Sequence, residues 1–241
     1  LFFNDTATTE IYTLSLHDAL PICQNNTVVD FLPILLSYGG WVIDDSNKPT
    51  VNTQEFKDAM NFYLKLIATG EAQVKDDLIA SVDTGAGTMG VGWPGWYTPT
   101  ADSPADYIAL SGAVSKGGET HNANVYGIWT IGIPANSQNQ ELAAELLTYL
   151  MDKDVQKSTV DKGGVPCRYS SLQDPEILKT YPQYEVVCKA LESGVYRPVI
   201  AEWTQFYTIL GTEMDNIING VKTVDQGLAD AQSQLETLMA G

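Results

Sequence analysis

Apolar residues recur at helical spacing in several stretches of the chain, whereas in others they alternate with polar residues. Residues 53–69 place an apolar side chain every three or four positions, which predicts a helix with one buried face. Residues 28–38 are apolar almost throughout, so they fit either a buried helix or a buried strand, and two glycines end the run. Residues 201–219 are also typical of a helix.

Three further helix starts are marked by capping residues. Ser137 and Thr223 each stand three residues before a glutamine, which is the spacing of a capping box. Asp174 stands before a proline, a residue that is favoured in the first turn of a helix. We therefore expect a helix to begin near each of these positions.

Other stretches show the period of a strand. Residues 89–93 alternate and are ended by Pro94, and residues 107–114 and 125–134 are further strand candidates. The stretch 41–52 predicts two short strands around a turn. Strands mixed with helices in this way indicate an α/β protein.

The first 22 residues fit none of these patterns. Residues 4–22, NDTATTEIYTLSLHDALPI, match residue for residue the translation of a widely used short-read sequencing adapter. They also lack the basic and continuously apolar regions of a signal peptide. We therefore expect residues 1–22 to be a non-native leader that packs against nothing, and the natural start of the protein to precede this sequence.

The charge balance limits the possible partners. Thirty acidic residues stand against thirteen basic ones, which gives a formal net charge of −17. Nucleic acids and anionic membrane surfaces both attract basic protein surfaces, so neither is an expected partner. No run is apolar enough to span a bilayer, and the hydrophobic fraction of 44% suits a packed globular protein.

Recognisable catalytic and metal-binding motifs are lacking. The sequence contains no phosphate-binding loop, no nucleophile elbow and no zinc-protease motif. It has no cluster of cysteine or histidine either, so we expect no catalytic residue, metal or cofactor. Cys167 and Cys188 could form a disulfide in an oxidising compartment or remain two ordinary thiols.

The placement of the aromatic residues indicates a binding site. All five tryptophans stand beside turns, glycines or prolines, or at a helix start: Trp41, Trp93, Trp96, Trp129 and Trp203. Sugars pack their C–H faces on aromatic rings and need polar groups around the rim, such as Asn124, Glu202 or Arg197. Each ring alone also fits a role in the core, and the many carboxylates leave a glycoside hydrolase open.

From Val28 to Leu238 the chain resembles bacterial extracellular solute-binding proteins, in the sugar-binding family that includes maltose-binding protein. Four stretches carry the resemblance, in this order: SVDTGAGTMGVGWPGWY, GIWTIGIPANSQNQELAAELLTYLMDKDVQ, GVPCRYSSLQDPEI and RPVIAEWTQFYTILGTEMDNIINGVKTVDQGLADAQSQL. The resemblance implies an α/β fold of the periplasmic-binding-protein type II, in which two lobes enclose a ligand.

The resemblance also implies how the chain divides between the two lobes. It assigns residues 23–130 and 167–241 to the second lobe and residues 131–166 to an excursion of the first lobe, most of which the sequence lacks. Apolar residues of this excursion would then be without their normal cover: Leu142, Leu146, Leu147 and Leu150.

By resemblance, the function is that of the substrate-binding component of an ABC-type carbohydrate importer. Such a protein captures a mono- or oligosaccharide or a polyol between its lobes and delivers it to the permease subunits in the membrane. It would act as a monomer in the periplasm or outside the cell, anchored to lipid through an N-terminus that precedes this sequence. An extracellular glycoside hydrolase and a sugar sensor are the alternatives.

The ligand-binding residues that the resemblance implies are mainly aromatic. Tyr207 falls where maltose-binding protein places a stacking tryptophan. The others lie at or just after the end of the strand 89–93, on the strand that crosses between the lobes, and at the start of the last helices: Trp93, Trp96, Tyr126, Gly127, Trp129, Glu202 and Trp203. We expect the rings to converge on one face of the second lobe.

Overall fold

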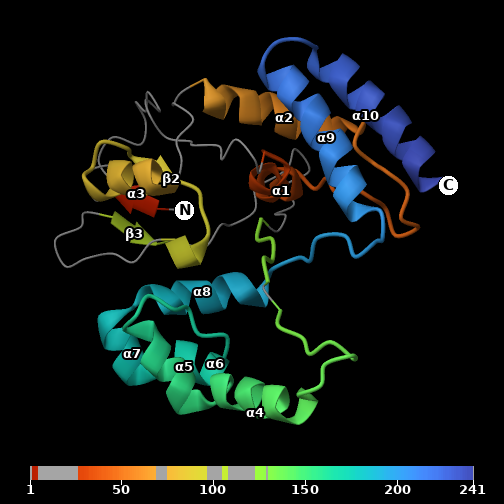
Figure 1. Ribbon diagram of the computed structural model, residues 1–241. Helices are drawn as coiled ribbons and strands as arrows, with labels where there is room; N and C mark the ends of the chain where they lie inside the picture. The colour runs from red at the N-terminus through yellow and green to blue at the C-terminus, as the bar shows by residue number, and fades with distance from the viewer. Residues whose placement is uncertain are drawn as a thin grey trace.

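The computed structural model describes residues 2–4, 27–68, 75–96, 105–107, 123–128 and 130–240. Their helices and strands form three groups (Figure 1). Helix α1, a member of the first group, lies near the centre of the molecule. The first group contains α1 (Thr27–Ser37), α2 (Gln54–Ile67), α9 (Trp203–Ile218) and α10 (Val224–Met239). The second contains α3 (Lys75–Asp83), a small sheet and the 3₁₀ turn η2 (Pro94–Trp96). The third contains α4 (Gln140–Leu150), α5 (Lys153–Val160), α6 (Tyr169–Leu172), α7 (Pro175–Thr180) and α8 (Gln183–Glu192).

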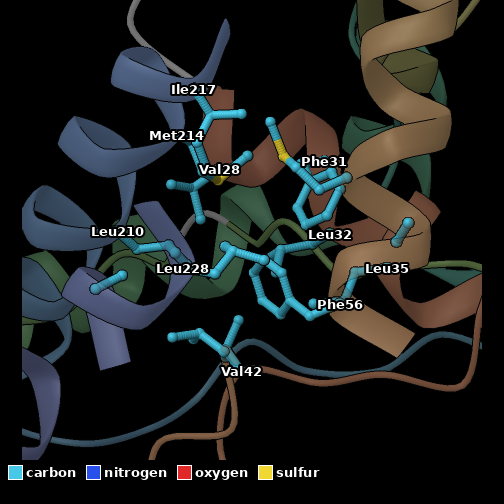
Figure 2. Close-up of a cluster of buried hydrophobic side chains, with 14 of the residues drawn as sticks. Val28, Phe31, Leu32, Leu35, Val42, Phe56, Leu210, Met214, Ile217 and Leu228 are labelled. Atoms are coloured by element: carbon cyan, nitrogen blue, oxygen red, sulfur yellow. The ribbon is translucent and has the colours of Figure 1, made fainter. Parts of the chain in front are cut away.

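The largest core lies where α1 packs against α2 and α9, and where α10 covers them. The apolar run of α1 is a buried helix, and four of its side chains belong to this core: Val28, Phe31, Leu32 and Leu35. The rings of Phe31 and Phe56 lie 5.2 Å apart across the α1–α2 contact (Figure 2). Because each large apolar side chain contributes about 1.5–3 kcal/mol when buried, this core is the main source of stability.

The ends of the helices test the capping predictions. The hydroxyl of Thr223 accepts a hydrogen bond from the N–H of Gln226, whose side chain accepts one in return from the N–H of Thr223, so this capping box is confirmed. The box expected at Ser137 is wrong, since α4 begins after Asn139 and the Gln140 side chain donates to the carbonyl of Ala135 instead. The helix expected from Asp174 is confirmed as α7, with this carboxylate as its cap.

The close contact between α9 and α10 depends on a glycine. A Cβ at Gly227 would lie 2.5 Å from Cγ1 of Ile217, whereas a Cβ at Gly211 on α9 would have its nearest neighbour, Cγ2 of Val28, at 3.5 Å. We therefore expect Gly227→Ala to lower the free energy of unfolding by about 1–2 kcal/mol through overpacking. Gly211→Ala should raise it by about 0.5–1 kcal/mol, since alanine restricts the unfolded chain. Urea unfolding of both variants checks this pair, and equal destabilisation by the two would contradict it.

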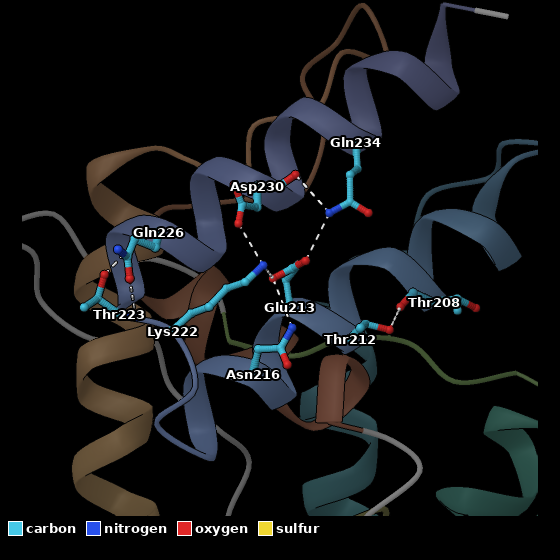
Figure 3. Close-up of polar contacts among 9 residues, drawn as sticks. All are labelled: Thr208, Thr212, Glu213, Asn216, Lys222, Thr223, Gln226, Asp230 and Gln234. Atoms are coloured by element: carbon cyan, nitrogen blue, oxygen red, sulfur yellow. Dashed lines mark hydrogen bonds and ion pairs between the residues drawn. The ribbon is translucent and has the colours of Figure 1, made fainter.

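A polar network links α9 and α10 beside this core (Figure 3). The side chain of Glu213 is 7% exposed and accepts hydrogen bonds from Nζ of Lys222 at 2.6 Å and Nε2 of Gln234 at 3.0 Å. Lys222 also reaches Oδ2 of Asp230 at 2.7 Å. Burial by itself would raise the pKa of Glu213, but Lys222, Asn216 and Gln234 outweigh it and lower this pKa. The carboxylate is therefore kept ionised between the two helices.

The helices α4 to α8 pack around a core of their own. Its buried members come from α5 to α8: Val160, Leu172, Ile177, Tyr184, Val187 and Cys188. The lobe boundary expected between residues 166 and 167 falls inside this group, because α6 contacts both α5 and α8. Residues on both sides of this boundary therefore pack in one group.

The cysteine pair is not bonded. Cys167 and Cys188 are both free thiols. Cys188 lies in the core of the α4–α8 group, where burial raises the pKa of its thiol. Cys167 is exposed, and its backbone N–H and its Sγ both contact Oε1 of Gln156, at 3.0 and 3.4 Å. The disulfide that the sequence left open is therefore absent from this structure.

Helix α4 has no buried residue. Leu142 and Leu146 are 66% and 55% exposed, and Leu150 is exposed beside them. As expected, these leucines are exposed among the described residues, while Leu147 is half-buried. Large apolar side chains at this spacing are typical of a helix face that packs against another part of a protein.

A three-stranded antiparallel sheet lies against α3. Its order is β2–β1–β3, made of β2 (Met89–Gly90), β1 (Phe2–Asn4) and β3 (Ala105–Tyr107). The expectation that the leader packs against nothing is wrong for residues 2–4, because they pair with both other strands. The leader's residues 5–22 lie outside the described residues.

The remaining strand predictions are confirmed in part. Residues 41–52 contain an isolated bridge between Ile43 and Pro49 in place of two strands. The strand expected over residues 89–93 is limited to Met89–Gly90. Of the stretch 107–114, only its first residue lies in a described strand, and the rest lies outside the described residues.

Candidate functional site

Two extended segments, residues 123–128 and 193–202, connect the α4–α8 group to the rest of the chain (Figure 1). They run parallel where Val125 forms a bridge with Val195. The N–H of Tyr126 donates to the carbonyl of Val195 at 2.9 Å, and the N–H of Val195 donates to the carbonyl of Asn124 at 2.9 Å. The strand expected over residues 125–134 is thus reduced to this short crossing, and we call the two paired segments the crossing segments.

Tyr126 is held firmly at the crossing. Its hydroxyl donates to the carbonyl of Leu191 at the end of α8. Its ring lies 4.7 Å from the ring of Tyr196, centroid to centroid, and a Cβ at Gly194 would overlap it at 2.1 Å. Tyr126 therefore joins the two crossing segments, and its half-buried ring contacts both Gly194 and the exposed ring of Tyr196.

Trp93 reaches the crossing from the end of β2. A Cβ at Gly127 would come within 2.1 Å of Cζ3 of the Trp93 indole, so the ring lies directly against this backbone. Only glycine permits such an approach. Trp93 is half-buried and Gly127 is exposed, so part of the indole remains in contact with solvent.

Trp203 and Tyr207 lie at the start of α9. The Trp203 ring stacks on Phe206 at a centroid distance of 5.6 Å and meets the edge of Tyr207 at 6.2 Å. Both rings are half-buried against the largest core, as is Val125 of the crossing. Glu202 is also half-buried and precedes the helix, but its side chain makes no capping hydrogen bond to α9.

The hydroxyl of Tyr207 lies in a charged environment. Burial, together with the carboxylate of Asp30, raises the pKa of Tyr207, while Arg197 on a crossing segment and the backbone of Val29 lower it in part. A negative charge on α1 and a positive charge on a crossing segment therefore shift the pKa of Tyr207 in opposite directions.

The structure places the expected rings in different surroundings. Trp93 lies against Gly127 and Tyr126 against Gly194 at the crossing, and Trp203 and Tyr207 share a core with Val125. Trp96 instead packs against the cluster of Leu78 and Val82 on α3, which Val186 of α8 also contacts. Trp129 lies outside the described residues.

Three neighbours of the site had no clear signal in the sequence. Gly194 and Tyr196 sit in a stretch without periodicity, and Asp30 is one charge in an apolar run.

A separate groove of about 400 Å³ lies between α2 and the start of α10 and contains none of the expected site residues. In the part of the chain that the structure describes, no three His, Cys, Asp or Glu side chains form a group that could hold a metal ion.

Residues 20–186 match the family described as bacterial extracellular solute-binding protein. Among curated proteins, the chain is 26% identical over 223 residues to a probable amino-acid ABC transporter periplasmic-binding protein of Sinorhizobium fredii, a match that covers 88% of this chain and 50% of the relative. The chain therefore spans about half the length of this relative.

Solved structures agree with this match. Maltose-bound MalE3 of T. maritima has a TM-score of 0.83 at 19% identity, over 98% of this chain and 69% of that one. A solute-binding protein of Thermotoga lettingae bound with α-D-tagatose has a TM-score of 0.79 at 18% identity, over 99% and 69%. One of Agrobacterium radiobacter in complex with ribitol has a TM-score of 0.77 at 22% identity, over 93% and 60%.

These likenesses confirm the expected α/β fold of the type II periplasmic-binding proteins. The family match covers two strands of the small sheet, β2 and β3, and the α4–α8 group as far as the first turn of α8. The chain therefore belongs to the family of bacterial extracellular solute-binding proteins.

Proposed function

We propose that the protein is the substrate-binding component of an ABC-type importer for carbohydrates or polyols. It captures a mono- or oligosaccharide or a polyol in the cleft between its two lobes and delivers it to the permease subunits. The observation that carries this proposal is the placement of half-buried rings at the crossing segments, where Trp93 lies on Gly127 and Tyr126 joins both segments. Such rings can pack against the C–H face of a sugar.

The known relatives support the ligand class. Three solved structures of the same fold hold maltose, α-D-tagatose and ribitol. We propose Asn124, Glu202 and Arg197 as the polar groups around the rim. We propose these binding residues: Trp93, Trp96, Tyr126, Gly127, Trp129, Glu202, Trp203 and Tyr207.

An amino acid is the second candidate ligand. The Sinorhizobium fredii relative is named as a probable amino-acid-binding component. The specific observation in this chain is that a cation, Arg197, and an anion, Asp30, act on the same phenol. Such a pair could hold the carboxylate and the ammonium group of an amino acid through charge-assisted hydrogen bonds.

The setting of the protein follows from the same proposal. We propose a monomer in the periplasm or outside the cell, anchored to lipid, that binds its ligand without breaking a bond. The helices of the described residues fall short of the length and apolarity that a membrane crossing requires. The exposed leucines of α4 would be covered by the first lobe of the full-length protein.

Calorimetric titration of the full-length protein tests the ligand class. Maltose, D-tagatose and ribitol form one set of ligands. The other set is a mixture of amino acids, followed by titration of each amino acid separately. Binding within the first set alone supports the importer for carbohydrates or polyols, whereas binding of amino acids alone replaces it by the second candidate. Feeble binding by the 241-residue chain is expected, since one lobe offers half a site, and tight binding by this chain would contradict the two-lobe proposal.

Tyr207→Ala is expected to weaken binding of the cognate ligand by about 1–2 kcal/mol, because the ring is half-buried in the protein and offers the remainder to the ligand. Tyr207→Phe keeps the ring and serves as the control for the hydroxyl. Calorimetry and urea unfolding of the same variants measure the effect. Unchanged affinity together with a loss of several kcal/mol in stability would show that the ring serves the core.

A further inference from the structure

The side chain of Tyr126 ties the first crossing segment, residues 123–128, to the end of α8 and to the start of the second. Its hydroxyl donates to the carbonyl of Leu191 on α8, and its ring lies 4.7 Å from that of Tyr196. The three atoms nearest to a Cβ at Gly194 all belong to this ring, at 2.1–2.5 Å. Because a real Cβ could not lie so close, only a glycine at position 194 leaves the ring in this place.

The backbone around Tyr126 is held at the same place. The N–H of Tyr126 donates to the carbonyl of Val195 at 2.9 Å, within the parallel bridge that joins Val125 and Val195. Val125 packs against the largest core, whereas Tyr126, the next residue of this extended stretch, contacts the end of α8. Successive side chains of an extended chain point to opposite sides, so this stretch is fixed from both sides.

Gly127 follows directly, and it is the residue on which the Trp93 indole lies. The three atoms nearest to a Cβ at Gly127 all belong to this indole, at 2.1–3.1 Å. Trp93 comes from the sheet group, between β2 and η2. The contact is therefore made on the backbone of Gly127, which shares a peptide unit with Tyr126. A shift of Tyr126 moves the surface on which the indole lies.

We propose that Tyr126 is a positioning residue of the candidate site: its side chain fixes the backbone of Gly127 and thereby holds the Trp93 indole at the crossing. Tyr126 then contributes to ligand binding through Trp93 and not by touching the ligand itself. The link to a ligand rests on the proposed function, in which Trp93 is a binding ring, whereas the position of the indole can be measured without any ligand.

Nuclear magnetic resonance of the isotope-labelled 241-residue chain tests the proposal through the Nε1–H signal of Trp93, which is identified by its loss in Trp93→Phe. In Gly194→Ala the new Cβ displaces the ring of Tyr126, so the Trp93 signal should shift. Gly132→Ala is the matched control, because a Cβ at Gly132 would have no atom within 4 Å. This variant should leave the signal unchanged.

A double substitution shows whether the effect passes through the ring. Tyr126→Ala should itself shift the Trp93 signal, and adding Gly194→Ala should then change it no further. Tyr126→Phe keeps the ring on Gly194 and should shift the signal less than Tyr126→Ala does. An unchanged signal in Tyr126→Ala, an equal shift in Gly132→Ala, or an undiminished effect of Gly194→Ala in the double variant would overturn the proposal. Should Gly194→Ala fail to fold, Tyr126→Ala decides, since it removes atoms and adds none.

Calorimetric titration of the full-length protein tests the link to the ligand, with maltose, D-tagatose, ribitol and the amino-acid mixture as probes. For a probe that binds, Tyr126→Ala should raise the Kd by about two- to tenfold, the range for one aromatic contact. It should have no such effect in the Trp93→Ala background, because it acts through that ring. An equal effect in both backgrounds would show direct contact and overturn the proposal. If no probe binds the wild type, the proposed function fails, while the indole signal still decides whether Tyr126 positions Trp93.

Discussion

Phe31→Ala is expected to lower the free energy of unfolding by about 3–5 kcal/mol, the cost of truncating a fully buried aromatic side chain. Phe31 is 0% exposed at the centre of the largest core. Its ring lies 5.2 Å from that of Phe56 and 5.3 Å from that of Tyr63, so both α2 neighbours lose a partner. The resulting cavity cannot collapse easily, because α9 packs against the same helix.

Phe62→Ala is the matched control for this prediction. Phe62 lies on α2, is 39% exposed and touches the ring of Tyr38 at 5.8 Å, outside the buried cluster. Its truncation should cost less than about 1 kcal/mol. Urea unfolding followed by circular dichroism gives both values, and a loss for Phe31→Ala no larger than that for Phe62→Ala would contradict the described core.

The sequence predicts the helices of this core well, because their signals are local. The period of residues 53–69 identifies α2, and the capping box of Thr223 and Gln226 marks where α10 begins. Each of these features depends on neighbours within one or two turns. The periodicity and the caps can therefore be recognised in a single amino-acid sequence.

The capping box that does not form at Ser137 shows that a local sequence motif does not by itself fix the start of a helix. Ser137 and Gln140 have the same spacing as Thr223 and Gln226, yet only the second pair forms the box. α10 is fixed by its packing on α9, whereas α4 has no buried residue to fix its start. The Gln140 side chain is therefore free to bond the carbonyl of Ala135, and the helix begins later.

The candidate site is predicted only in part for a related reason. The sequence identifies rings and glycines, but it gives no sign that Trp93 lies on Gly127 or that Tyr126 reaches Leu191. These contacts join residues that are 34 and 65 positions apart and have no common period. Their pairing is set by the crossing segments, which only the three-dimensional structure brings together.

Glu213→Gln is expected to lower the free energy of unfolding by about 2–3 kcal/mol at neutral pH. The substitution keeps the shape of the side chain but removes the charge that holds Lys222 at 2.6 Å and Gln234 at 3.0 Å between α9 and α10. Hydrogen bonds to charged groups contribute about 1.5–3 kcal/mol. Asp230→Asn is the control, since the Asp230 side chain is 54% exposed, and an exposed ion pair contributes at most about 1 kcal/mol.

The effect of Glu213→Gln should also depend on pH. Because the pKa of Glu213 is lower in the folded state than its ordinary value of 4.5, the folded state favours the ionised carboxylate. The stabilisation is complete above the ordinary value and is lost as the pH falls through the lowered pKa. Wild type and variant should therefore differ most at neutral pH and converge in acid. Urea unfolding from pH 7 downward measures the difference. A gap that stays constant into acid would mean that the glutamate stabilises the protein through packing rather than through its charge.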